Sequence, residues 1–140
     1  MVDQHPIVGS WRVSVQIPGM AGELTNLARL SADGGIVVAF PSPTPAAPGS
    51  SHKLEYWTSA LGEWQASDAD TVRLLFVSLG ADETGAAVGT HTVTASVTVD
   101  STGTSWSGPF QIDISDATGV ATGEINGTVS ATRISVSGSA

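Results

Sequence analysis

The chain has 140 residues, a net charge of −8 and no cysteine, and 41% of its residues are hydrophobic. These values predict one domain over residues 1–140 with a single core, and they exclude disulfides and thiolate metal sites. The 5 Lys and Arg residues against 13 Asp and Glu are too few cations to favour nucleic acid or an anionic membrane surface as a partner. No apolar stretch is long enough to span a membrane and the start does not resemble a signal peptide, so a cytoplasmic location is expected.

Polar and apolar residues alternate along most of the chain, with turn signals between the alternating segments, and this pattern predicts β-strands. The expected strands are residues 7–17, 24–30, 36–40, 53–58, 63–66, 71–79, 89–99, 104–115 and 121–134. The proline-rich segment 41–51 is expected to be a long loop outside any ladder, because proline has no N–H to donate. Residues 135–140 are expected to be a frayed tail.

The predicted fold class is therefore all-β, with eight to nine antiparallel strands joined in sequence by hairpins. Closing such a meander into an up-and-down β-barrel buries the apolar faces and removes the edges. A sandwich is the alternative, but the lack of a long crossover favours the barrel. A barrel that is not fully closed would leave β edges that could support a homodimer.

Two segments far apart in the sequence meet in such a barrel, because its first and last strands are neighbours. Gly9-Ser10-Trp11 opens the first strand, and Arg133 lies near the end of the last, so the guanidinium could stack on the indole. Together with the final segment Gly-Thr-Val-Ser-Ala-Thr-Arg-Ile at 127–134, these residues resemble the lipocalin-like calycin superfamily, in particular its small bacterial members. The resemblance implies a barrel in which Trp11 and Arg133 have a structural role. It also implies that the barrel holds a small hydrophobic molecule.

His91 is the first candidate for chemistry, because it shares its strand face with Val93, Ala95 and Val97 and should point inward. A neutral histidine in an apolar cavity could act as a general base or bind a ligand group. It could equally be a core histidine bonded to a neighbour. No second histidine or carboxylate has ligand spacing to it, so no metal is expected.

An aromatic segment offers further candidates. Tyr56, Trp57 and Trp64 suit the wall or mouth of a pocket, with the proline-rich loop as a flap, although ordinary core packing explains them too. Arg73, if it points inward, could bind a carboxylate or enolate oxygen, and Asn26 is a weaker candidate of the same kind.

Three functions from different classes fit these residues. The first is binding of a small hydrophobic molecule in the barrel cavity. The second is a cofactor-free cyclase or isomerase acting there on a polyketide-like or other secondary-metabolite substrate, with catalytic residues His91, Tyr56 and Arg73. The residues expected to contact the ligand are Trp57, Trp64, Trp106, Phe110 and Asn26. The third is an interaction module with a filled core, which the Thr-rich outer faces disfavour.

Small residues at inner positions of the last strands favour a cavity over a filled core. These residues are Ala95, Gly108, Gly123, Gly127 and Ala131. No cofactor is expected for any of the three functions.

Overall fold

The computed structural model describes residues 4–19, 23–46 and 49–136, and these residues form strands and loops without a helix. The strands are β1 (Gly9–Gln16), β2 (Leu24–Leu30), β3 (Gly35–Ala39), β4 (Thr44–Pro45), β5 (Leu54–Trp57), β6 (Ala60–Ala66), β7 (Thr71–Asp82), β8 (Ala87–Val99), β9 (Ser105–Ser115) and β10 (Ala121–Arg133). No helix in the described part of the chain could cross a membrane.

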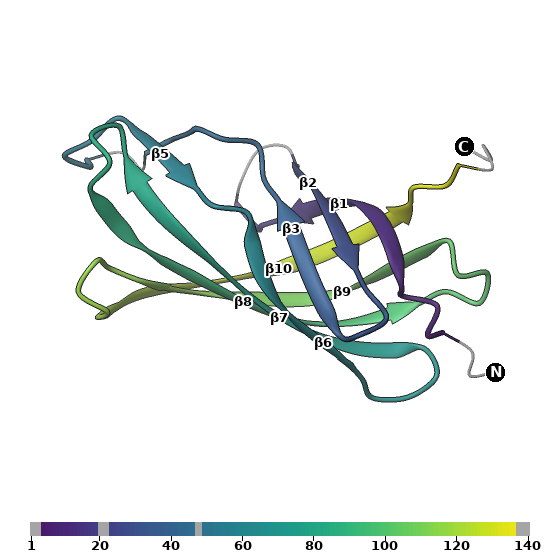
Figure 1. Ribbon diagram of the computed structural model, residues 1–140. Helices are drawn as coiled ribbons and strands as arrows, with labels where there is room; N and C mark the ends of the chain where they lie inside the picture. Colours follow the sequence, from purple (N-terminus) through teal and green to yellow (C-terminus); the bar gives the residue numbers. More distant parts are fainter. Residues whose placement is uncertain (1–3, 20–22, 47–48, 137–140) are drawn as a thin grey trace.

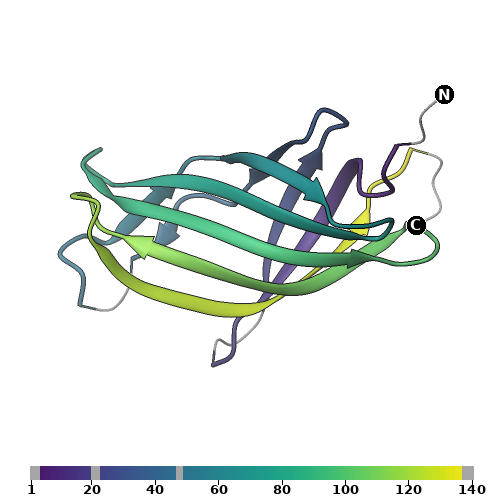
Figure 2. The same cartoon turned by 90° about the horizontal axis from the view of Figure 1, so that it is seen from below.

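Eight of these strands close into an antiparallel up-and-down barrel, which confirms the predicted fold class (Figures 1 and 2). The strands follow one another around the barrel in the order β1-β2-β3-β6-β7-β8-β9-β10, and β10 pairs with β1 to close it. The β7–β8 and β9–β10 hairpins project at one end of the barrel, on the left of Figure 1, and both termini lie at the other end.

The two remaining strands correct two details of the sequence interpretation. β4 lies within the predicted loop 41–51 and pairs with β5, where Pro45 sits at the outer edge and needs to donate no N–H. The predicted break between strands 53–58 and 63–66 is also misplaced, because β6 already begins at Ala60 and does not pair with β5. Instead, β5 and β6 pair one after the other along β7, and Thr58 between them bonds to Leu79.

The termini lie at a closed end, where Arg133 seals the barrel. Its guanidinium carbon lies 4.3 Å from the centre of the Trp11 ring, as predicted. The same guanidinium donates to the carbonyl of Gly103 at 2.9 Å, to that of Val8 at 3.0 Å, and to that of Pro6. Gly9 lies directly beneath it, and a Cβ at Gly9 would come within 2.4 Å of the guanidinium. The Gly-x-Trp pattern is thus explained by packing against the arginine.

Hairpin geometry is fixed by aspartates that begin several turns. The Asp82 and Asp116 carboxylates each accept a hydrogen bond from the backbone N–H and one from the hydroxyl of the threonine two residues later. In Asp100, burial acts to raise the pKa, but hydrogen bonds from Thr104, Ser105 and Thr102 outweigh it and lower the pKa to about 2. These short turns hold the long hairpins in register.

Part of β10 extends beyond the closed barrel. β1 pairs with residues 128–133 of β10 only, so among the described residues 121–127 have β9 as their one neighbouring strand. Glu124 lies in the middle of this segment, with its side chain exposed.

The outer face differs between the two sides of the barrel. β8 and β10 carry mainly Thr, Ser and Asn outside, as predicted. The outer faces of β2, β3, β6 and β7 instead carry exposed apolar residues, namely Leu27, Val37, Leu61, Leu75 and Leu79. The expectation that the outer surface lacks an apolar area therefore holds for one side only.

The Arg133 contacts predict a large loss of stability on Arg133→Met. The substitution removes a cation over an indole and three charge-assisted hydrogen bonds, so the free energy of unfolding should fall by about 2–4 kcal/mol. Urea denaturation followed by tryptophan fluorescence measures this change. Arg12→Met is the matched control, because Arg12 is exposed on the outer face of β1 and should change stability by less than about 0.5 kcal/mol. Equal effects of the two substitutions would contradict the proposed seal.

Candidate functional site

The inner wall of the barrel changes from closed to open along its axis. Near the termini, inward side chains such as Trp11, Leu30 and Val97 have no exposed surface. Toward the projecting hairpins, the inward apolar side chains are only partly buried; they include Val15, Ile17, Phe40, Phe76, Val93 and Ile112. Because these residues face inward and are not covered, the barrel has an apolar interior that opens at the hairpin end.

A small void lies deeper in this interior, between the open half and the closed end. Its volume is about 60 Å³, whereas pockets that enclose drug-sized ligands occupy roughly 300 Å³ or more. The residues that line it are Val13, Val15, Asn26, Ala28, Ile36, Val38, Leu74, Phe76, Val93, Ala95, Trp106, Phe110 and Val129. The sequence predicted a cavity that holds a whole small ligand, but the structure encloses only a void that is too small for one.

Two of the three glycines that were expected to create space, Gly108 and Gly127, explain why the void is narrow. A Cβ at Gly127 would lie 2.8 Å from the Phe110 ring, so that ring already occupies the place beside the glycine. At Gly108, a Cβ would lie 2.0 Å from the carbonyl oxygen of Ser96, so backbone fills the space. These glycines allow close approach of neighbouring groups. Ala95 is one small residue that does line the void.

Two polar groups belong to the otherwise apolar residues that line the void. Asn26 on β2 is half-buried, and its side-chain amide makes no hydrogen bond to any described residue. Trp106 on β9 is 3% exposed, and its indole N–H has no hydrogen-bond partner in the described chain. Polar groups buried in proteins are normally hydrogen-bonded, so the Trp106 N–H is a donor that the described protein leaves unused. The half-buried Asn26 amide stays open to water or to a ligand.

His91 lies at the open end and faces inward, as predicted. Its partner in the β7–β8 ladder is Ser78 on β7. Ser78 is 2% exposed and donates its hydroxyl proton to the carbonyl of Thr58. The His91 ring stacks on Trp57 with centroids 3.8 Å apart and an angle of 20° between the planes. Trp57 reaches this position by crossing Gly80, where a Cβ would come within 2.7 Å of the indole. The stack therefore depends on the absence of a side chain at position 80.

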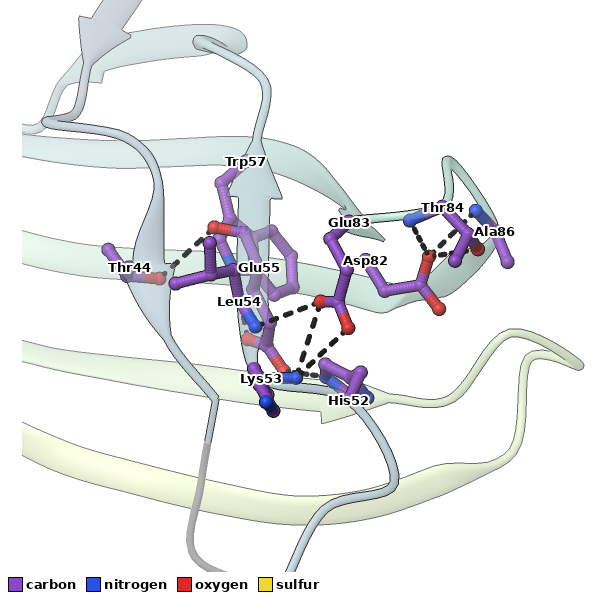
Figure 3. A network of polar contacts seen from close by, with 10 residues as sticks. All are labelled: Thr44, His52, Lys53, Leu54, Glu55, Trp57, Asp82, Glu83, Thr84 and Ala86. Atoms are coloured by element: carbon purple, nitrogen blue, oxygen red, sulfur yellow. Dashed lines mark hydrogen bonds and ion pairs between the residues drawn. The ribbon is translucent and has the colours of Figure 1, made fainter.

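Acidic residues hold the Trp57 side of the opening in place (Figure 3). Glu55 accepts a hydrogen bond from the Trp57 indole at 3.1 Å and pairs with His52 at 2.8 Å. Glu83 accepts backbone N–H bonds from Lys53 and Leu54, at 3.1 and 3.0 Å. These contacts attach β5 and the loop before it to the β7–β8 hairpin, and so they position one wall of the opening.

The electrostatics of His91 favour its neutral form. Burial lowers the pKa of the imidazole below its ordinary value, and the negative charge of Glu55 opposes this shift. Neither ring nitrogen hydrogen-bonds to a described residue. The neutral ring therefore has a free nitrogen lone pair.

Two of the predicted catalytic residues do not share this site. Tyr56 is 43% exposed on the outward face of β5, opposite to Trp57, because alternate residues of a strand face opposite sides. Arg73 is exposed on the outer face of β7, where it lines a shallow depression of about 830 Å³ together with Glu63 and Gln111. Both positions correct the expectation that these side chains reach the cavity with His91.

The remaining predicted contact residues lie away from the open end. Trp106 and Phe110 line the void and are buried. Trp64 lies toward the closed end, where its indole donates to the carbonyl of Ser31 at 2.8 Å. Sequence reasoning missed Glu55 as a partner of Trp57, although their shared face on β5 was a signal for it.

A comparison of the chain with protein-family models, curated proteins and solved structures finds no match. The site is therefore interpreted from its own geometry.

The charge of Glu55 should have a measurable effect on the pKa of His91. Replacing Glu55 with Gln removes the charge that raises the His91 pKa, so this pKa should fall further below its ordinary value. The imidazole can be titrated by NMR with ¹⁵N-labelled histidine. Glu83→Gln is the control, because Glu83 bonds to the backbone of Lys53 and Leu54 and its charge does not act on the His91 pKa, which should stay unchanged. A rise in the pKa on Glu55→Gln would contradict the assigned electrostatics.

Proposed function

We propose that the protein binds a small hydrophobic molecule in the barrel cavity, through the open hairpin end. The observation that carries this proposal is the partly buried apolar inner wall at that end. Apolar side chains that face inward without being covered lose the stabilisation of full burial, and a bound apolar molecule would restore it.

The size of the void limits how such a molecule would lie. The enclosed space of about 60 Å³ takes only a few non-hydrogen atoms, so one end of the ligand would enter it. The rest would lie along the open half, between Phe76, Val93 and Ile112. The contact between Trp11 and Arg133 at the closed end supports the resemblance to calycin barrels. A cytoplasmic location goes with this proposal as a prediction.

A substitution that fills the void tests the proposal. Ala95→Leu places three more carbon atoms in the void, so the affinity for an apolar fluorophore such as N-phenyl-1-naphthylamine should fall about tenfold or more. Fluorescence titration measures the affinity, and circular dichroism checks the fold. Thr98→Leu is the control. It introduces leucine on the outer face of β8, outside the void, and should leave the affinity unchanged. Wild-type protein that fails to bind the fluorophore would refute the proposal.

A second candidate function is a cofactor-free cyclase or isomerase acting on a polyketide-like substrate. The specific observation in its favour is the His91 imidazole, which is kept neutral by burial and has no hydrogen-bond partner among the described residues. Such a group at the opening could remove a proton from a bound substrate as a general base.

His91→Phe separates the two functions, because phenylalanine keeps a ring that can stack on Trp57 but has no basic nitrogen. An enzyme that uses His91 as a base should lose about 100-fold or more in turnover while it retains ligand affinity. Turnover is followed by mass spectrometry of candidate substrates. If wild-type protein returns every bound compound unchanged, the enzyme function is excluded for those compounds and binding remains.

A further inference from the structure

We propose that the barrel selects uncharged apolar ligands that end in one oxygen function, such as an alcohol or a ketone, and rejects the corresponding carboxylates. This inference rests on the proposed binding function and specifies the chemical class of its ligand. Asn26 is the residue that we assign to the contact with the oxygen.

The position of Asn26 is the first step of the argument. It faces inward on β2 at the level of Val13 on β1, and it lines the void with apolar neighbours such as Val38 and Phe76. Its amide makes no hydrogen bond within the described chain. Asn26 is half-buried, so its amide is open to water in the empty barrel, and a ligand that displaces this water must replace its hydrogen bonds. A ligand oxygen that enters the void would satisfy this amide.

The charges around the void supply the second step. None of the described residues that line it is charged. At the closed end, Arg133 lies on the Trp11 ring and bonds to three backbone carbonyls, so its charge is already compensated. At the open end, His91 is kept neutral by burial, and the nearby Glu55 is an anion. A carboxylate in the void would therefore lose its hydration without meeting a cation.

The hydrogen-bonding capacity of the wall gives the third step. The Asn26 amide can both donate and accept, so it suits an alcohol, which also does both, and a ketone, which only accepts. The Trp106 indole N–H, buried in the same wall without a partner, is a donor only. Donors therefore outnumber acceptors, which favours a ligand group that carries oxygen lone pairs.

Matched ten-carbon probes test this inference in the intact protein. Decan-1-ol, decan-2-one and decanoate compete for the barrel against N-phenyl-1-naphthylamine at about pH 8, where the acid is ionised. We expect the alcohol and the ketone to bind about tenfold or more tightly than decanoate. Repeating the titration in about 0.5 M NaCl screens the net charge of the protein, so a preference that persists arises inside the barrel.

The variant Asn26→Leu tests whether Asn26 causes the preference for the alcohol and the ketone over decanoate. It should weaken binding of the alcohol and the ketone about three- to tenfold, while the affinity for the fluorophore stays the same or rises. Asn126→Leu makes the same change on the outer face of β10 and should have no effect. If Asn26→Leu does not fold, Asn26→Asp provides a second test, because an anion at this position should abolish binding of decanoate and weaken binding of the alcohol less.

The outcomes distinguish the inference from the function on which it rests. Equal or tighter binding of decanoate, or Asn26 variants that leave the preference among the probes unchanged, would overturn the inference while apolar binding stands. Failure of the fluorophore and of all three probes to bind would overturn the proposed function, and the inference with it.

Discussion

The contact between Arg133 and Trp11 is the constraint on which the barrel depends. It joins the last strand to the first, where the two residues are direct partners in the β1–β10 ladder. The guanidinium also ties the segment before β1 and the β8–β9 turn to the same point, through the carbonyls of Val8 and Gly103. Closure also uses the β1–β10 backbone ladder and the buried side chains Val13 and Ala131, but pairing residues so far apart in sequence is costly in loop entropy, which the Arg133 contacts offset.

The two ends of the barrel differ in how their interior is filled. The large side chains Trp11 and Trp106 meet edge to face, with centroids 5.8 Å apart, and fill the cross-section near the termini. Among the described residues, no comparable pair spans the centre of the hairpin end, since Trp57 lies flat against β7 and β8, on the wall. The interior is therefore solid at one end and accessible at the other. This asymmetry, more than the number of strands, supports the proposed binding function.

The fold was largely predictable from the sequence, because alternation over long strands such as 89–99 and 121–134 is a strong signal. The inward position of His91 followed from the same periodicity. Prediction failed where a local feature overrode the pattern. Arg73 was ambiguous because its strand is apolar on both faces, and the outer face of β7 turned out to carry exposed leucines. The volume of the void could not be predicted, because it depends on where the Phe110 ring lies relative to Gly127.

The free edge of β10 bears on how this protein behaves at high concentration. An unpaired strand edge is a template for intermolecular sheet growth, and residues 121–127 present one outside the closed ring of strands. Glu124 at the centre of this segment would place two carboxylates side by side if two copies joined edge to edge about a two-fold axis through that residue, and like charges opposite one another are unfavourable. Glu124 thus disfavours edge-to-edge association along residues 121–127, where closure of the barrel does not provide that protection.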